Sequence, residues 1–126
     1  MTPRLPDYLD HIRKAATGAL QYIEGMELSE FLKDSFVQDA VTMKFIVIGE
    51  ASAKIVNGYP DFVELYPEVP RHQMRGMRNR MAHGYFDIDY VTVWNTAQHF
   101  LPEMLQALPV LPLEPDEDDC PGMDGP

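Results

Sequence analysis

The side chains best suited to chemistry lie in one stretch of eight residues, Arg78-Asn79-Arg80-Met81-Ala82-His83-Gly84-Tyr85. Arginine is a permanent cation whose planar fork of donors suits a phosphate group. Histidine is the side chain whose unperturbed pKa suits proton transfer near neutral pH. An arginine and a histidine this close together predict cleavage of a phosphodiester bond without a metal ion.

The predicted reaction gives each of these side chains a role. We expect His83 to take the proton from a ribose 2′-hydroxyl, and Arg78 to hold the non-bridging oxygens as charge builds on phosphorus. Asn79 would orient the phosphate or the imidazole. The products are a 2′,3′-cyclic phosphate and a 5′-hydroxyl, and the need for a 2′-hydroxyl restricts the substrate to RNA.

The spacing of Arg78 and His83 constrains how they meet one phosphate. Five residues place them about 140° apart around an ideal helix. Either the helix ends between them, helped by the cap conformation that Gly84 tolerates, or a second chain closes the site. The spacing alone leaves both arrangements open, and such a pair also occurs by chance in helical proteins.

The charge of the chain is unevenly distributed. The net charge is -10, and the segment after Leu113 holds six of the twenty acids and no cation, so residues 1–113 carry -4. Four of the ten cations are Arg71, Arg75, Arg78 and Arg80. An acidic protein with one basic patch suits a focused phosphate site better than an extended nucleic-acid track. Arg71 and Arg75 are candidate RNA-phosphate contacts, whereas Arg80 is best interpreted as solvated.

Composition predicts one cytoplasmic domain without a metal or cofactor. The chain has 126 residues, no apolar run long enough to cross a bilayer and no apolar signal core at its start. Its single cysteine, Cys120, excludes an intramolecular disulfide. The spacing of His11, His72 and His99 matches no metal-ligand pattern.

Apolar periodicity predicts helices in the first half of the chain. The first helix covers residues 5–23, and Gly25 is expected to end it. Ser29 is expected to cap a second, longer helix over residues 31–56. Its stretch Phe45-Ile46-Val47-Ile48 is rich in β-branched residues, but the helical period continues on both sides and argues against a strand.

Turn signals divide the middle of the chain. We expect the second helix to be interrupted near residues 33–35 and to stop at Asn57-Gly58. A proline-rich loop follows, with a short helical turn at residues 61–65. Pro70 would occupy the first position of a third helix that ends near His83-Gly84. Three methionines are predicted to face the core from this helix: Met74, Met77 and Met81.

A fourth helix completes an all-α, antiparallel four-helix bundle. Asp87 or Asp89 is expected to cap it, and Pro102 to kink or split it. We expect residues 1–111 to form this helical domain. Residues 112–126 are predicted to form an acidic, Pro/Gly-rich disordered tail.

Several segments resemble the HepT-like branch of the HEPN superfamily. The resemblance rests on Val47-Ile48-Gly49-Glu50-Ala51, on Tyr66-Pro67-Glu68-Val69-Pro70, on the eight residues from Arg78 to Tyr85, and on the following Phe86-Asp87-Ile88-Asp89. It implies a HEPN-like bundle that is a homodimer, with its site along the cleft between subunits. It also implies an endoribonuclease toxin of a type II/VII-like toxin–antitoxin pair, in which an MntA-type nucleotidyltransferase is the antitoxin and Tyr85 accepts adenylyl groups.

A second function remains open. The acidic charge is also compatible with a non-catalytic helical binding subunit of a small nucleotidyltransferase. The presence of Arg78, His83 and Tyr85 together favours the ribonuclease, because a binding subunit has no need for a phosphate fork and a base beside a modifiable phenol.

Overall fold

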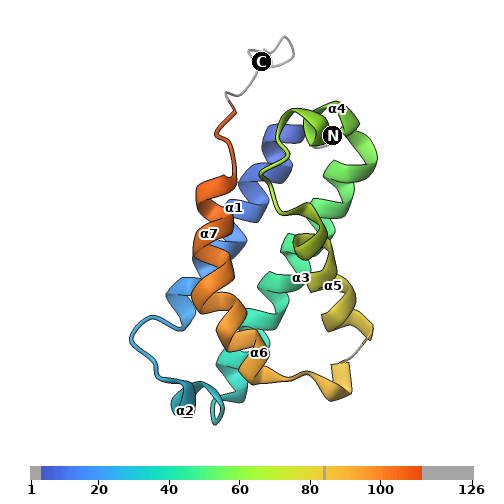
Figure 1. Ribbon diagram of the computed structural model, residues 1–126. Coiled ribbons are helices and arrows are strands. Elements are labelled where there is room, and N and C mark those ends of the chain that lie inside the picture. The colour runs from blue at the N-terminus through green and yellow to red at the C-terminus, as the bar shows by residue number, and fades with distance from the viewer. Residues whose placement is uncertain (1–3, 84, 112–126) are drawn as a thin grey trace, which may run out of the picture.

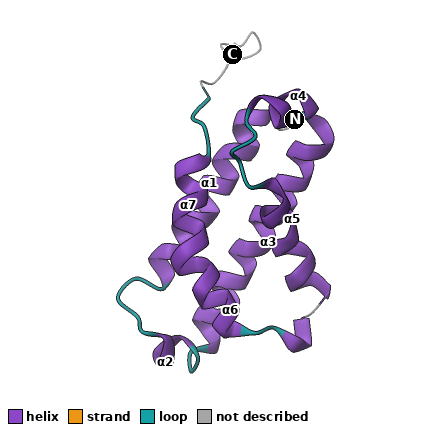
Figure 2. Ribbon diagram, viewed as in Figure 1, coloured by secondary structure: helices purple, strands orange, loops and turns teal. Residues whose placement is uncertain are grey.

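The computed structural model describes the backbone of residues 4–83 and 85–111 and the side chains of residues 4–77 and 86–111. Within these ranges, every regular element is a helix, and Figure 2 shows helices joined by loops without a strand. The all-α class is therefore confirmed. The predicted disordered tail lies outside the described residues.

Four helical segments form the bundle, and each runs antiparallel to the one before it in the chain (Figure 1). They are α1 (Leu5–Tyr22), α3 (Ser35–Gly58), α5 (Arg71–His83) and a composite of α6 (Tyr90–Asn95), η2 (Thr96–Phe100) and α7 (Leu101–Ala107). Helix α3 packs against both α1 and α5, and α1 packs against η2 and α7. The short helices α2 (Leu28–Phe31) and α4 (Pro60–Leu65) cover opposite ends of the bundle.

One apolar core joins all four segments. Its side chains come from the helical stripes that the sequence predicts, since burial of an apolar face is the main source of helix stability in a protein. The stretch around Phe45 lies inside α3 and is helical. The largest fully buried side chains are Leu9, Ile12, Phe31, Val41, Phe45, Ile48, Met74, Leu101 and Met104.

Most predicted boundaries in the first half agree with the structure, but one capping residue is wrong. Helix α1 ends just before Gly25, which has a φ of +79°, and α3 ends at Gly58. Ser29 lies inside the short helix α2 and does not cap the long helix. Asp34 caps it instead, because its carboxylate accepts the Val37 N–H at 3.0 Å. The predicted interruption thus separates α2 from α3.

The later boundaries are close to expectation. The turn predicted at residues 61–65 is helix α4, which begins at Pro60. Helix α5 begins at Arg71, so Pro70 lies one residue before the position predicted for it, where its carbonyl accepts the Met74 N–H at 3.1 Å. Of the two candidate caps for the last helix, Asp89 accepts the N–H groups of Val91 and Thr92.

Pro102 changes the winding of the last helical segment without interrupting it. A proline within a helix has no N–H to donate, and its ring crowds the carbonyl four residues earlier. Just before Pro102, Thr96–Phe100 form a π-helical turn, in which the Leu101 N–H donates to the Thr96 carbonyl five residues back. The wider turn absorbs the irregularity, and α7 then continues to Ala107.

Candidate functional site

The predicted catalytic residues lie on one continuous helix. Helix α5 includes Arg78, Asn79 and His83, which is its last residue. The arrangement in which the helix ends between Arg78 and His83 is therefore wrong, because both positions belong to the same run of helix. Tyr85 begins the 3₁₀ turn η1 (Tyr85–Asp87) immediately afterwards. The side chains of these four residues lie outside the described ranges.

The residues of α5 lie in different directions around the helix axis, and ideal helix geometry gives the angles between their positions. At 100° per residue, positions 71, 75 and 78 fall within about 60° of one another. Position 83 lies about 140° from position 78 and within about 20° of position 76. Positions 71, 75 and 78 thus follow a line separate from that of position 83, whereas position 80 lies about 60° from position 83.

The buried side chains of α5 fix the orientation of the helix about its own axis. Met74 and Met77 are buried, as predicted for two of the three methionines, and α5 packs closely on α3. Arg71 and Arg75 are half-buried. Residues 71–85 include four arginines and no acid, so α5 is a cationic element on an acidic protein, and the local potential favours an anionic ligand.

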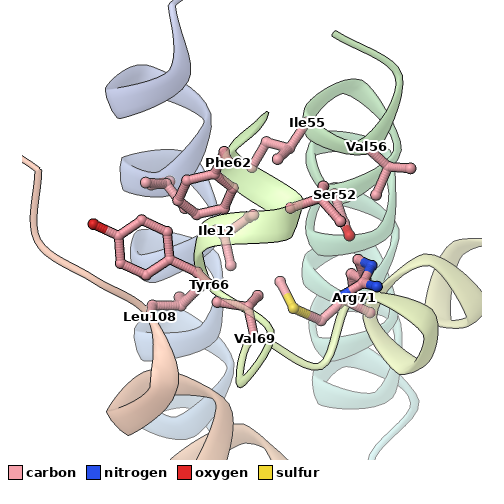
Figure 3. A pocket seen from close by; sticks show the side chains of 12 residues that line it. Ile12, Ser52, Ile55, Val56, Phe62, Tyr66, Val69, Arg71 and Leu108 are labelled. Carbon is pink, nitrogen blue, oxygen red and sulfur yellow. The ribbon is translucent and has the colours of Figure 1, made fainter. Parts of the chain in front are cut away.

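Arg71 lies at an almost filled apolar pocket under α4 (Figure 3). Side chains from α1, α3, α4 and α5 line the pocket, together with Leu108 just after α7, and Figure 3 shows Arg71 on the same side as Ser52 and Val56. The Phe62 and Tyr66 rings stack at its edge with centroids 4.8 Å apart. The lining is mostly apolar, so this pocket fixes the start of α5 in the core and does not resemble a polar reaction site.

A groove lies on another flank of α5, and the sequence did not indicate it. Within the described residues, α5 packs closely on α3 but not on the C-terminal helical segment. The space between α5 and the π turn is lined by His72, Gln73, Gly76, Met77, Thr96 and Phe100. No periodicity connects the first four residues with the last two, because only the tertiary fold brings these two segments together.

The outer face of α3 carries an apolar stripe. Positions 36, 40, 43 and 47 follow one line along the helix, at the spacing that places residues on one face. Phe36 is 85% exposed and Met43 is 56% exposed, while Ala40 and Val47 are partly buried. Phe86, in the turn after α5, is 95% exposed. The stripe on α3 is therefore a candidate surface for contact with a protein partner.

The remaining histidines are isolated. His11, His72 and His99 are exposed, and no group of three metal-ligating side chains occurs among the described residues. No helix in the described part of the chain is long and apolar enough to cross a membrane.

Comparison with known proteins identifies relatives of this chain. The relatives include a candidate RNase of Methanocaldococcus jannaschii, 37% identical over 78% of this chain and 73% of its own. The "Probable ribonuclease HepT" of Thermococcus cleftensis is 35% identical over 78% of this chain and 86% of its own. No solved structure gives a significant match.

The family model described as Ribonuclease HepT-like matches residues 10–111, which is nearly all of the helical bundle. The chain therefore belongs to the HepT-like ribonuclease family, as its resemblance implied. The match includes all of α5 and the turn after it.

Proposed function

We propose that this protein is a metal-independent endoribonuclease whose active site lies on α5. The observation that carries the proposal is the placement of Arg78 and His83 on one continuous, acid-free helix in a HepT-like chain. The 2′-oxygen attacks phosphorus while His83 takes its proton. The bond from phosphorus to the 5′-oxygen breaks, and that oxygen takes a proton from water. Arg78 stabilises the charge on the non-bridging oxygens, and Asn79 orients the reacting groups.

The same helix supports a site built by two chains. Because α5 does not end between Arg78 and His83, one helix presents these positions about 140° apart. A homodimer allows Arg78 of one protomer to act with His83 of its partner. The apolar stripe of Phe36 and Met43 and the exposed Phe86 offer a surface for such an association. In this arrangement Arg71 and Arg75 contact neighbouring phosphates of the RNA.

Cleavage of total RNA in the presence of EDTA tests the activity. The wild type should produce fragments with cyclic-phosphate ends, and His83→Ala and Arg78→Ala should not. Arg80→Ala is the matched control, because it removes an arginine from the same helix without removing a proposed catalytic group. Circular dichroism should show that all variants remain helical. A wild type of unmodified mass that leaves RNA intact would instead support the binding subunit.

We further propose that the enzyme is a toxin whose partner is an MntA-type nucleotidyltransferase antitoxin. Tyr85 follows His83 by two residues and begins the turn at the end of α5. Adenylylation of Tyr85 adds a negatively charged phosphate beside the cationic helix, where it competes with RNA for the arginines.

Tyr85→Phe tests whether Tyr85 serves regulation and is not needed for RNA cleavage itself. Tyr85→Phe should cleave RNA but resist neutralisation by the partner and ATP, and its mass should not rise by about 329 Da, the adenylyl increment. Tyr22→Phe is the control, since Tyr22 is exposed but lies at the end of α1. Complete neutralisation of Tyr85→Phe would exclude Tyr85 as the regulatory acceptor.

A further inference from the structure

We propose that the groove between α5 and the π turn binds a nucleobase of the RNA substrate, a short distance along the strand from the phosphate that is cleaved. In this proposal Phe100 is the stacking platform, and Gln73 and His72 contact the edge of the base. The inference rests on the proposed ribonuclease function and adds a site that determines which RNA positions are cleaved.

The lining of the groove suits a planar, polar-edged ligand. Phe100, at the end of the π turn, contributes a half-buried aromatic ring, and no described aromatic side chain stacks on it. An aromatic ring can stack on any base. The Gln73 amide both donates and accepts hydrogen bonds, and its side chain is exposed. π turns occur often at functional sites.

Charge distinguishes this groove from an open groove at the end of α1. Among the described residues, no acid lines the space beside α5. The groove at the end of α1, by contrast, includes Glu24, which would repel a phosphate. The cationic Arg75 lies next to Gly76 on the same helix, so the groove beside α5 is the better complement to a polyanion.

The groove is also continuous with the proposed active site. Gly76 and position 83 share one line along α5, separated by about 10 Å of helix rise. That distance corresponds to about three stacked nucleotides at 3.4 Å each, or fewer in an extended strand. An RNA strand whose scissile phosphate lies at His83 therefore reaches the groove with a nearby base.

Gly76 provides a way to fill the groove without disturbing the fold. A Cβ added at Gly76 meets no atom within 4 Å, and replacing a glycine inside a helix removes an entropic cost. Gly76→Leu should therefore fold at least as well as the parent while occupying the space meant for the base. Gly58→Leu is the matched control, because Gly58 also faces open space but lies at the end of α3.

The test measures binding, so that it does not depend on catalysis. All variants carry His83→Ala, and the probe is a fluorescently labelled oligoribonucleotide followed by anisotropy. Loss of one base–aromatic stack weakens binding by about five- to 150-fold. We expect a weakening in this range for Gly76→Leu and for Phe100→Leu, which keeps apolar volume but removes the ring. Gly58→Leu should bind as the parent does.

Abasic substitutions in the oligonucleotide sharpen the result. Removing the base at one position near the cleaved bond should weaken binding by the parent but have no further effect on Gly76→Leu, as expected when both changes remove the same contact. Equal binding by the parent and Gly76→Leu would overturn the inference. So would weaker binding accompanied by dissociation of a parental dimer in light scattering, because the groove would then be a subunit contact.

The outcomes also separate this inference from the proposed function. If the wild type cleaves RNA, and Gly76→Leu binds as its His83→Ala parent does and cleaves as the wild type does when His83 is present, the ribonuclease stands and the base site is wrong. If the wild type does not cleave, but the position-specific loss of binding is observed, the base site stands and the ribonuclease is wrong. A His83→Ala parent that binds no RNA would overturn the base site.

Discussion

Two inactive variants should restore cleavage when they are mixed, if the active site is shared between protomers. Arg78 and His83 are on the same unbroken helix. Ideal helix geometry separates their Cα atoms by about 9 Å and their positions by about 140° around the axis. Positions so far apart on a single α5 are poorly suited to act together on one nucleotide, with Arg78 holding the phosphate and His83 deprotonating the 2′-hydroxyl. The Arg78→Ala and His83→Ala chains should therefore complement each other across a dimer.

The expected size of the effect follows from twofold symmetry. A homodimer of this kind has two equivalent sites, each with Arg78 from one chain and His83 from the other. Random exchange of the two variants makes about half of the dimers mixed, and each mixed dimer has one intact site, so activity should reach about one quarter of the wild-type value. The rate is measured with a fluorogenic RNA after denaturation and joint refolding, which ensures exchange.

A second mixture makes the result decisive. The double variant Arg78→Ala/His83→Ala is refolded with an equal amount of wild type. For a shared site, every mixed dimer is inactive and about one quarter of the activity remains, whereas a site within one chain retains about one half. An inactive mixture of the single variants, together with half-activity in this second mixture, would refute the shared site.

Three further predictions follow from the described contacts. Asp89→Ala should lower the unfolding free energy by about 1 kcal/mol, because it removes the acceptor for two N-terminal N–H groups. Asp87→Ala, the control, should change the unfolding free energy by less than about 0.5 kcal/mol. Phe36→Glu should keep the helical content, since Phe36 is 85% exposed. It should convert a dimer to monomers in light scattering and reduce cleavage. A Phe36→Glu variant that remains dimeric would exclude the apolar stripe on α3 as the dimer interface. Phe45→Ala should cost about 3–5 kcal/mol in urea unfolding, because Phe45 is only 2% exposed, and a smaller loss would mean that the core collapses around the gap.

The helical segments could be predicted from the sequence because their signals are local. Apolar spacing depends only on the period of the helix, and Gly25 and Gly58 lie where α1 and α3 end. The choice of cap was harder, because several residues in a short stretch can accept the same N–H groups. Ser29 and Asp34 both have suitable side chains, and the packing of α2 against the core determines that Asp34 caps α3.

The candidate site, too, was predictable from the sequence only in part. Its residue types and their spacing are sequence properties, and so is the family to which the chain belongs. The sequence left open whether a helix end separates Arg78 from His83, and the continuous α5 excludes that arrangement. Whether a helix continues depends on how its apolar face is buried, and Met74 and Met77 bury the face of α5 against the rest of the core.

The groove beside α5 depends wholly on the tertiary structure. His72 and Phe100 are 28 positions apart in the chain, and no periodic pattern relates them. They line one space because α5 packs on α3 while the segment from Tyr90 to Ala107 packs on α1, which leaves a gap between the two. The sequence by itself determined the helices and the reactive residue types, since both follow from local patterns. Long-range packing alone determined which surfaces meet and which remain open to a ligand.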